Sequence, residues 1–165
     1  MGGKCLRSTF MYAGRRCGAA MGAAMAGCDE PMMSAPSRYG RAIGEACQLR
    51  DDLLGVVGAT DVTGKPSDGA LAPRKATAVV VAARRYAEPA ARVEFDALLA
   101  APFLEGAAVE RLRELIIASG ACDRVEAMIS DCLSEARHAV RTAALPDSAC
   151  CLLDGLGVIC GARRQ

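Results

Sequence analysis

Helical periodicity is the feature that most constrains how this chain folds. Apolar residues recur at three- and four-residue spacing in successive segments, and no segment alternates apolar and polar residues as a strand does. Apolar residues make up 52% of the chain and aromatic residues only 4%, so Ala, Val, Leu, Met and Cys must fill the core. These residues favour closely packed helices over sheet. We therefore predict an all-α helical bundle.

Gly, Pro and capping residues divide the chain into helical segments. Ser37 is the expected N-cap of a long helix that ends near residue 57. The glycines and prolines of residues 58–73 exclude regular structure there, and a long irregular connection is often functional. The helices are expected at residues 4–27, 37–57, 74–86, 89–99, 107–119, 121–142 and 148–161. A length of 165 residues fits a single helical domain, 1–165.

The charge balance argues against two classes of partner. Twenty basic and nineteen acidic residues leave a net charge of +1, which gives no support to nucleic acid or an anionic membrane surface as the main partner. A few local Lys or Arg residues still suffice to bind a phosphate compound. No apolar run approaches the roughly 20 residues that span a bilayer. We expect a cytoplasmic protein that does not span a membrane.

The nine cysteines are not arranged as a metal site. No CxxC pair occurs, and His138 is the only histidine. The odd number and the absence of an apolar signal segment at the N-terminus favour reduced thiols that act as small buried hydrophobes. We expect nine free thiols and no zinc. A redox or metal role is the alternative interpretation.

Residues 41–57 carry the candidate chemistry. On a helix, Asp51, Asp52 and Gly55 share one face with Gln48, and the opposite face is apolar. A solvated polar face is the simpler interpretation. However, a glycine such as Gly55 destabilises the interior of a helix by about 1 kcal/mol relative to alanine. A position that lines a cavity would explain such a glycine, whereas a solvent-exposed position would not. The helix leads to Lys65, and carboxylates beside a lysine suit a magnesium-bridged diphosphate.

The motif resembles the second aspartate-rich region of trans-isoprenyl diphosphate synthases of the geranylgeranyl or polyprenyl type. The matching residues are QLRDDLLG at 48–55, then Gly58, then TGKP at 63–66. The resemblance implies the C-terminal half of the isoprenoid-synthase fold, Mg²⁺ as cofactor and an allylic diphosphate as substrate, condensed with isopentenyl diphosphate. It implies Asp51 as principal metal ligand with Asp52 supporting it. The implied diphosphate-binding residues are Lys4, Gln48, Lys65 and, as a helper, Lys75.

The chain also departs from the family pattern. Ala59 stands where the family usually has an aspartate, and residues 68–74 lack several carboxylates. No first aspartate-rich motif and no arginine pair following one occur; Arg15-Arg16 and Arg84-Arg85 are interpreted as solvated charges. Three hypotheses stay open: a truncated prenyltransferase chain, a non-catalytic partner of a complete synthase, and an inactive helical remnant. The open apolar surface of half a fold favours a homo- or hetero-oligomer with a prenyl synthase.

Overall fold

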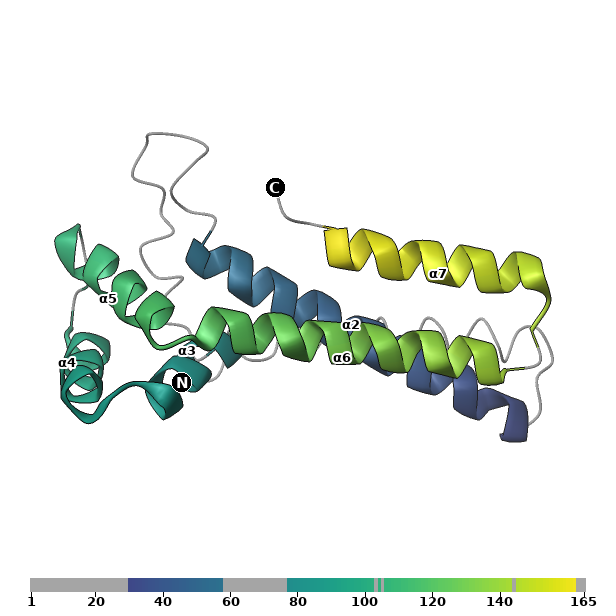
Figure 1. The fold of residues 1–165 in the computed structure, drawn as a ribbon, viewed down its shortest axis with the longest axis horizontal. Coiled ribbons are helices and arrows are strands. Elements are labelled where there is room, and N and C mark those ends of the chain that lie inside the picture. Colours follow the sequence, from purple (N-terminus) through teal and green to yellow (C-terminus); the bar gives the residue numbers. More distant parts are fainter. Residues whose placement is uncertain (1–29, 58–76, 103, 105, 144, 163–165) are drawn as a thin grey trace. The chain divides into compact units, whose positions relative to one another are not determined.

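The described part of the chain is entirely helical and loop. A computed structural model describes residues 30–57, 77–102, 104, 106–143 and 145–162, without the side chains of residues 30–33 and 159–162. No strand occurs in these ranges, so the all-α prediction is confirmed, whereas the helix expected at residues 4–27 lies outside them. The helices of Figure 1 are α2 (Glu30–Val57), α3 (Ala78–Tyr86), α4 (Pro89–Ala100), α5 (Ala107–Ala118), α6 (Ala121–Thr142) and α7 (Asp147–Ala162). None of these described helices has the length and hydropathy needed to cross a membrane.

The long helix α2 begins earlier than predicted. It starts at Glu30, so Ser37 is not its N-cap and Pro36 lies inside it. Pro31 falls in the first turn, where backbone N–H groups have no helical partner in any case. Pro36 removes one hydrogen bond from a helix of 28 residues. The two prolines therefore do not force the loop that the sequence indicated.

Helix α3 begins later than predicted, and its cap explains why. Thr77 has an extended backbone, with φ −84° and ψ 164°. Its Oγ1 accepts a hydrogen bond of 3.4 Å from the Val80 N–H, as an N-cap residue does. The helix therefore starts at Ala78 and not near residue 74.

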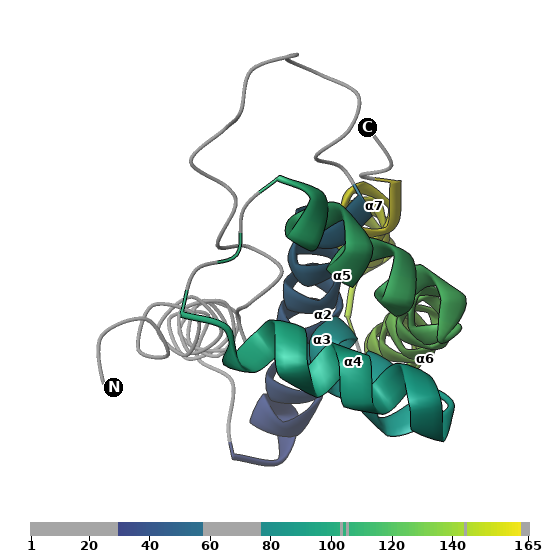
Figure 2. The same cartoon turned by 90° about the vertical axis from the view of Figure 1, so that its left-hand side faces the viewer.

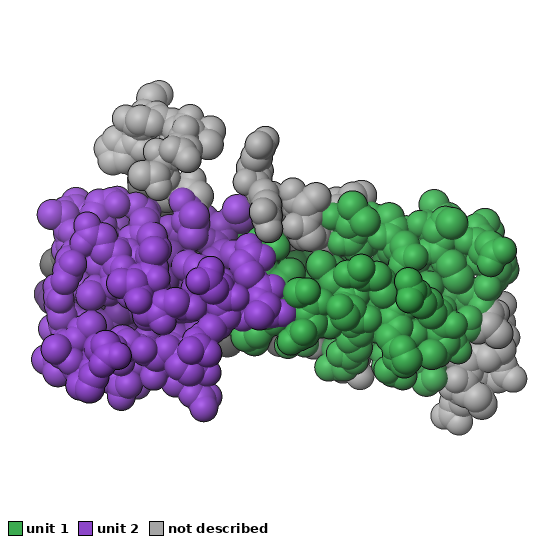
Figure 3. Space-filling view, viewed as in Figure 1, with its two compact units in different colours: residues 1–50, 128–164 green, residues 51–127, 165 purple. Residues whose placement is uncertain are grey.

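The chain divides into two compact units, coloured separately in Figure 3. The first comprises residues 1–50 and 128–164, and the second comprises residues 51–127 with residue 165. The boundaries fall within α2 and within α6. The expectation of one domain over residues 1–165 stays a prediction.

Helices α2, α6 and α7 build the core of the first unit. Its buried residues are Tyr39, Ala42, Ile43, Cys47, Ala136, Ala139 and Val140, with Leu133, Cys150 and Leu153 packed against them. The Tyr39 hydroxyl donates a hydrogen bond of 2.7 Å to the Leu153 carbonyl oxygen, which connects α2 with α7. Arg41 and Glu135 form an ion pair between α2 and α6. This hydrogen bond and this ion pair thus add directional contacts to the apolar packing of α2 against α6 and α7.

Replacing Tyr39 by Phe should weaken the fold and change its pH dependence. Loss of the hydroxyl bond costs about 1 kcal/mol. Burial and, secondarily, Asp154 raise the pKa of Tyr39 to about 12 from 10.0. The folded chain therefore retains a proton that the unfolded chain releases, so this contribution is full below pH 10 and is lost as the pH rises toward 12.

Urea unfolding of both proteins at about pH 8 and about pH 11 measures the effect. The native chain should lose more stability between these two pH values than Tyr39→Phe does. Equal losses in the two proteins would contradict the raised pKa.

One cysteine departs from the expectation of nine free thiols. Cys47, on the buried face of α2, is disulfide-bonded. Among the described side chains, Cys122, Cys132, Cys150 and Cys151 are free. An odd count and the lack of CxxC spacing do not exclude a bond between cysteines distant in sequence. The cytoplasmic location, which rested partly on reduced thiols, stays a prediction.

Helices α3, α4 and α5 pack against one another in the second unit, and Figure 2 shows all three, with α4 seen from the side. Their largest fully buried side chains are Val79, Phe95, Leu112 and Ile116. Gly120 adopts φ +70°, a conformation that glycine tolerates best, and connects α5 directly to α6. This unit holds the end of α2 that carries Asp51 and Asp52.

Candidate metal and diphosphate site

The adjacent carboxylates Asp51 and Asp52 have different surroundings. Both lie near the C-terminal end of α2 and both are half-buried. The Asp52 Oδ2 accepts a hydrogen bond of 3.2 Å from the backbone N–H of Ala78. The Asp51 carboxylate makes no hydrogen bond or ion pair with any residue that the structure describes. Asp51 is therefore the carboxylate of the pair that stays available to a ligand.

The bond of Asp52 reaches the N-terminus of α3. Ala78 is the first residue of that helix, where N–H groups lack helical partners and carry a partial positive charge. Asp52 bonds one of these groups and Thr77 bonds another. A carboxylate or hydroxyl in such a place stabilises a helix by about 0.5 to 2 kcal/mol. Asp52 is thus part of the packing between α2 and α3.

Arg113 holds the same end of α2, a role that the sequence pattern did not indicate. Its side chain is only 10% exposed, and Nε donates a hydrogen bond of 2.8 Å to the Val56 carbonyl oxygen. Nη1 contacts both carboxylate oxygens of Glu110 at 2.6 Å. A cation is favourable beside the last carbonyls of a helix. The sequence signal for this role is an arginine that directly follows Leu112 in α5, beside the apolar residues Leu112, Leu115 and Ile116.

Gly55 lies one turn after Asp51 and leaves space beside it. A Cβ atom added there would meet no atom of the described residues within 4 Å. Gln48 lies on α2 three residues before Asp51; it is half-buried and already has an interaction of its own. Its assignment to a diphosphate site, like the cavity beside Gly55, stays a prediction.

The remaining predicted site residues cannot be placed beside these carboxylates. Lys4, Lys65 and Lys75 lie outside the described residues. Among the residues that are described, no three His, Cys, Asp or Glu side chains form a group that could hold a metal ion by themselves. A cation at Asp51 would therefore need oxygen ligands in addition to the described side chains.

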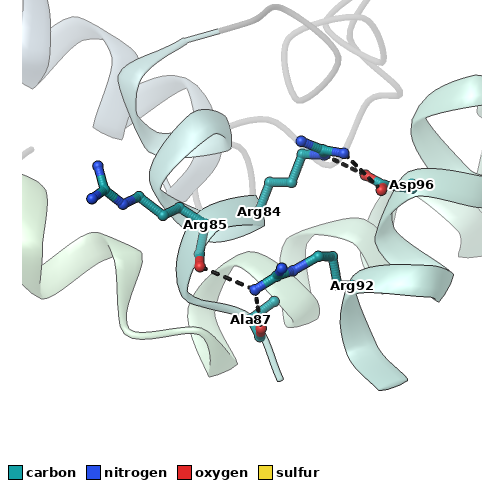
Figure 4. A network of polar contacts seen from close by, with 5 residues as sticks. All are labelled: Arg84, Arg85, Ala87, Arg92 and Asp96. Carbon is teal, nitrogen blue, oxygen red and sulfur yellow. Dashed lines mark hydrogen bonds and ion pairs between the residues drawn. The ribbon is translucent and has the colours of Figure 1, made fainter. Parts of the chain in front are cut away.

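The second arginine pair, Arg84-Arg85, belongs to a separate network on α3 and α4. Figure 4 shows Arg84 turned toward Asp96, which it contacts at 2.6 and 3.0 Å, and Arg85 turned away. Arg92 donates 3.2 Å hydrogen bonds to the carbonyl oxygens of Arg85 and Ala87. The hydrogen bond from Arg84 holds the pKa of the Asp96 carboxyl below its usual value.

These arginines line a surface hollow of about 400 Å³ together with Val81. Arg84 is neutralised by Asp96, and Arg92 bonds the end of α3. Both side chains thus have structural partners.

The helical fold and the QLRDDLLG segment agree with a class of all-helical prenyl-transferring proteins. The sequence profile of the polyprenyl synthetase family matches residues 2–116, and the chain belongs to that family. It is 38% identical over 133 residues to geranylgeranyl diphosphate synthase of Mycobacterium tuberculosis, a match that covers 80% of this chain and 36% of the relative. It is 48% identical over 59 residues to the (2E,6E)-farnesyl diphosphate synthase of Mycobacterium bovis, covering 36% of this chain and 16% of the relative.

Solved structures lead to the same family. A polyprenyl synthetase from Streptomyces coelicolor superposes with a TM-score of 0.78 at 28% identity, over 93% of this chain and 47% of that one. A geranylgeranyl pyrophosphate synthase from Corynebacterium glutamicum, complexed with isoprenyl diphosphate and magnesium, superposes with a TM-score of 0.73 at 32% identity, over 87% of this chain and 41% of that one. The chain therefore spans less than half the length of these relatives.

Proposed function

We propose that this chain is a prenyl diphosphate synthase chain that binds the diphosphate of an allylic substrate through Mg²⁺ at Asp51. The observation that carries the proposal is the Asp51 carboxylate, which lies within the family motif and has no bonding partner among the described residues. The family reaction is the condensation of an allylic diphosphate with isopentenyl diphosphate. The 165 residues contain the second aspartate-rich motif only, so we propose that by themselves they bind but do not catalyse.

The residues at this end of α2 suit magnesium in chemistry and in number. Mg²⁺ prefers carboxylate oxygens and is commonly held by one or two carboxylates together with substrate phosphates and water. Asp51 offers one such carboxylate, and Gly55 leaves space next to it. When bound, the ion would offset the negative charge of the diphosphate.

The other predicted residues have separate parts in this proposal. Lys65 and Lys4 contact the diphosphate oxygens as cations, and Lys75 assists them. Gln48 lies one turn before Asp51, and its side-chain amide donates or accepts a hydrogen bond at the edge of the diphosphate site. Asp52 supports Asp51. Only Gln48, Asp51 and Asp52 lie within the described residues.

Asp51→Asn should abolish magnesium-dependent binding of a non-hydrolysable allylic diphosphate analogue. The amide is close in size to the carboxylate but lacks the negative charge that the cation requires. We expect the dissociation constant to rise by at least about tenfold, which corresponds to about 1.4 kcal/mol. Isothermal titration calorimetry with and without Mg²⁺ measures the change.

Asp131→Asn on α6 is the matched control, because Asp131 is an exposed aspartate outside the motif. It should bind the analogue as the native chain does. If binding did not depend on Mg²⁺, or if Asp51→Asn bound as tightly as the control, the proposed site would be wrong.

A second candidate function is supported by a different observation. Helix α7 exposes Leu152 and Leu156, one turn apart on the same face, with exposed fractions of 73% and 52%, and it also exposes Val158, with 68%. Exposed apolar side chains clustered on one helix are typical of an interaction surface. In this alternative the chain is a non-catalytic partner that packs through α7 against a complete prenyl synthase. A homo-oligomer through the same face is the competing outcome.

The double variant Leu152→Lys, Leu156→Lys should weaken association with a complete synthase of the family. Two charges on the face would have to be desolvated on binding, so the affinity should fall at least about tenfold. Analytical ultracentrifugation of the chain alone and mixed with the synthase measures this. Val93→Lys, at a 73% exposed position of α4, is the control. Unchanged association of the double variant would exclude α7 as the interface.

A further inference from the structure

The structure assigns Asp52 the role of a positioning residue: it ties α2 to α3 and thereby holds the neighbouring Asp51, the proposed metal ligand, in place. The metal half of this inference rests on the proposed function. The tie itself is a hydrogen bond of 3.2 Å between the Asp52 Oδ2 and the Ala78 N–H, which lie 26 residues apart in the sequence. Both residues belong to the second unit.

Electrostatics separate the two roles. The N-terminus of α3 carries the positive end of the helix dipole, equivalent to roughly half an elementary charge. A divalent cation on Asp52 would lie next to that positive end and would withdraw charge from the oxygen that accepts the hydrogen bond. Neighbouring residues on a helix point about 100° apart. Asp51 therefore presents its carboxylate in another direction, and no described group occupies it.

Arg113 provides the second tie at the same end of α2. Its Nε bonds the Val56 carbonyl oxygen, four residues after Asp52, from a position that is buried on α5. The backbone that carries Asp51 is thus held to α3 on one side and to α5 on the other. A ligand group fixed in this way does not have to be ordered when the cation binds, which favours binding. Asp52 therefore contributes to binding through Asp51.

Three variants distinguish a tie from a ligand. Asp52→Asn retains an oxygen that accepts the Ala78 N–H bond but has no charge for a cation. Asp52→Ala has neither the accepting oxygen nor the charge. Asp51→Asn removes the proposed metal ligand. Two measurements are made on each variant of the full chain: the exchange rate of the Ala78 amide proton by NMR, and the magnesium-dependent affinity for inorganic pyrophosphate by calorimetry.

We expect Asp52→Asn to keep both the slow Ala78 exchange and the affinity within about threefold of the native chain. Asp52→Ala should accelerate Ala78 exchange about tenfold and weaken the affinity severalfold, because the end of α2 is no longer held. Asp51→Asn should lose the affinity and leave Ala78 exchange unchanged. This pattern, with the conservative variant rescuing both properties, is not produced by a metal ligand.

Two results would overturn the role assigned to Asp52. If Asp52→Asn lost affinity as fully as Asp51→Asn, Asp52 would be a ligand. If Asp52→Ala left Ala78 exchange unchanged, the tie would be absent. If the native chain did not bind pyrophosphate with Mg²⁺, the proposed function and the ligand role of Asp51 would both fall, and Ala78 exchange would still decide the role of Asp52 as a tie.

Discussion

The purified 165-residue chain should form no detectable product from an allylic diphosphate and isopentenyl diphosphate. Catalysis of this kind depends on stabilising the charge of the departing diphosphate. The sequence contains one aspartate-rich motif, whereas the family pattern has two. Loss of such charge-stabilising groups lowers rates by about 10²- to 10³-fold for a single group, so the loss of a whole motif should bring turnover below detection.

Radiolabelled isopentenyl diphosphate, followed by product extraction and chromatography, measures the turnover. A complete synthase of the family, assayed in parallel, is the positive control. Analogue binding by the same preparation shows that the chain is folded. Robust turnover by the pure chain would refute the argument that a single motif is insufficient.

Phe95→Ala should destabilise the second unit by about 3 to 5 kcal/mol, the usual cost of such a truncation in a core. Phe95 is fully buried, and it is the one buried residue of α4, all twelve residues of which are described. Its loss leaves a cavity and removes the main apolar contact of that helix. Because domains are stable by only about 5 to 15 kcal/mol, the variant should be close to unfolding at 37 °C.

Urea unfolding followed by circular dichroism gives the change in free energy. Val93→Ala is the matched control, since Val93 lies on the same helix with 73% of its surface exposed. It should change stability by no more than about 0.5 kcal/mol. A Phe95→Ala variant as stable as Val93→Ala would mean that α4 does not depend on this contact.

The local pattern of the helices was predictable from the sequence. Residues placed on the apolar face of α2, namely Ala42, Ala46, Leu49, Leu53 and Val56, are all buried. The stripe of α5 at Leu112, Leu115 and Ile116 is buried as well. Both follow from the 3.6-residue turn, which depends on neighbouring residues only. The family motif was recognisable for the same reason, because its residues are contiguous.

Contacts between distant segments were not predictable in this way. The bond from Asp52 to Ala78 and the bond from Arg113 to Val56 join residues 26 and 57 positions apart. The sequence pattern gives no register between two helices, so it indicated Asp52 only as a support for Asp51 and not its bond to α3. The disulfide of Cys47 was missed because spacing rules apply only to nearby cysteines. The start of α2 at Glu30 differs from the prediction because Ser37, a good N-cap by residue type, lies inside the helix.

The weak attachment of α7 bears on how long the chain would survive in a cell. No described side chain of α7 is fully buried, and Gly155 and Gly157 lie in its interior, where each costs about 1 kcal/mol relative to alanine. The hydrogen bond from Tyr39 is one of the few directional bonds that hold it. Such a helix opens at a lower free energy than the rest of its unit, and proteases cleave the opened form. A protein surface that packs against α7 would therefore lengthen the lifetime of the chain. The half-life of the chain in a protease digest thus measures whether α7 is packed against such a surface.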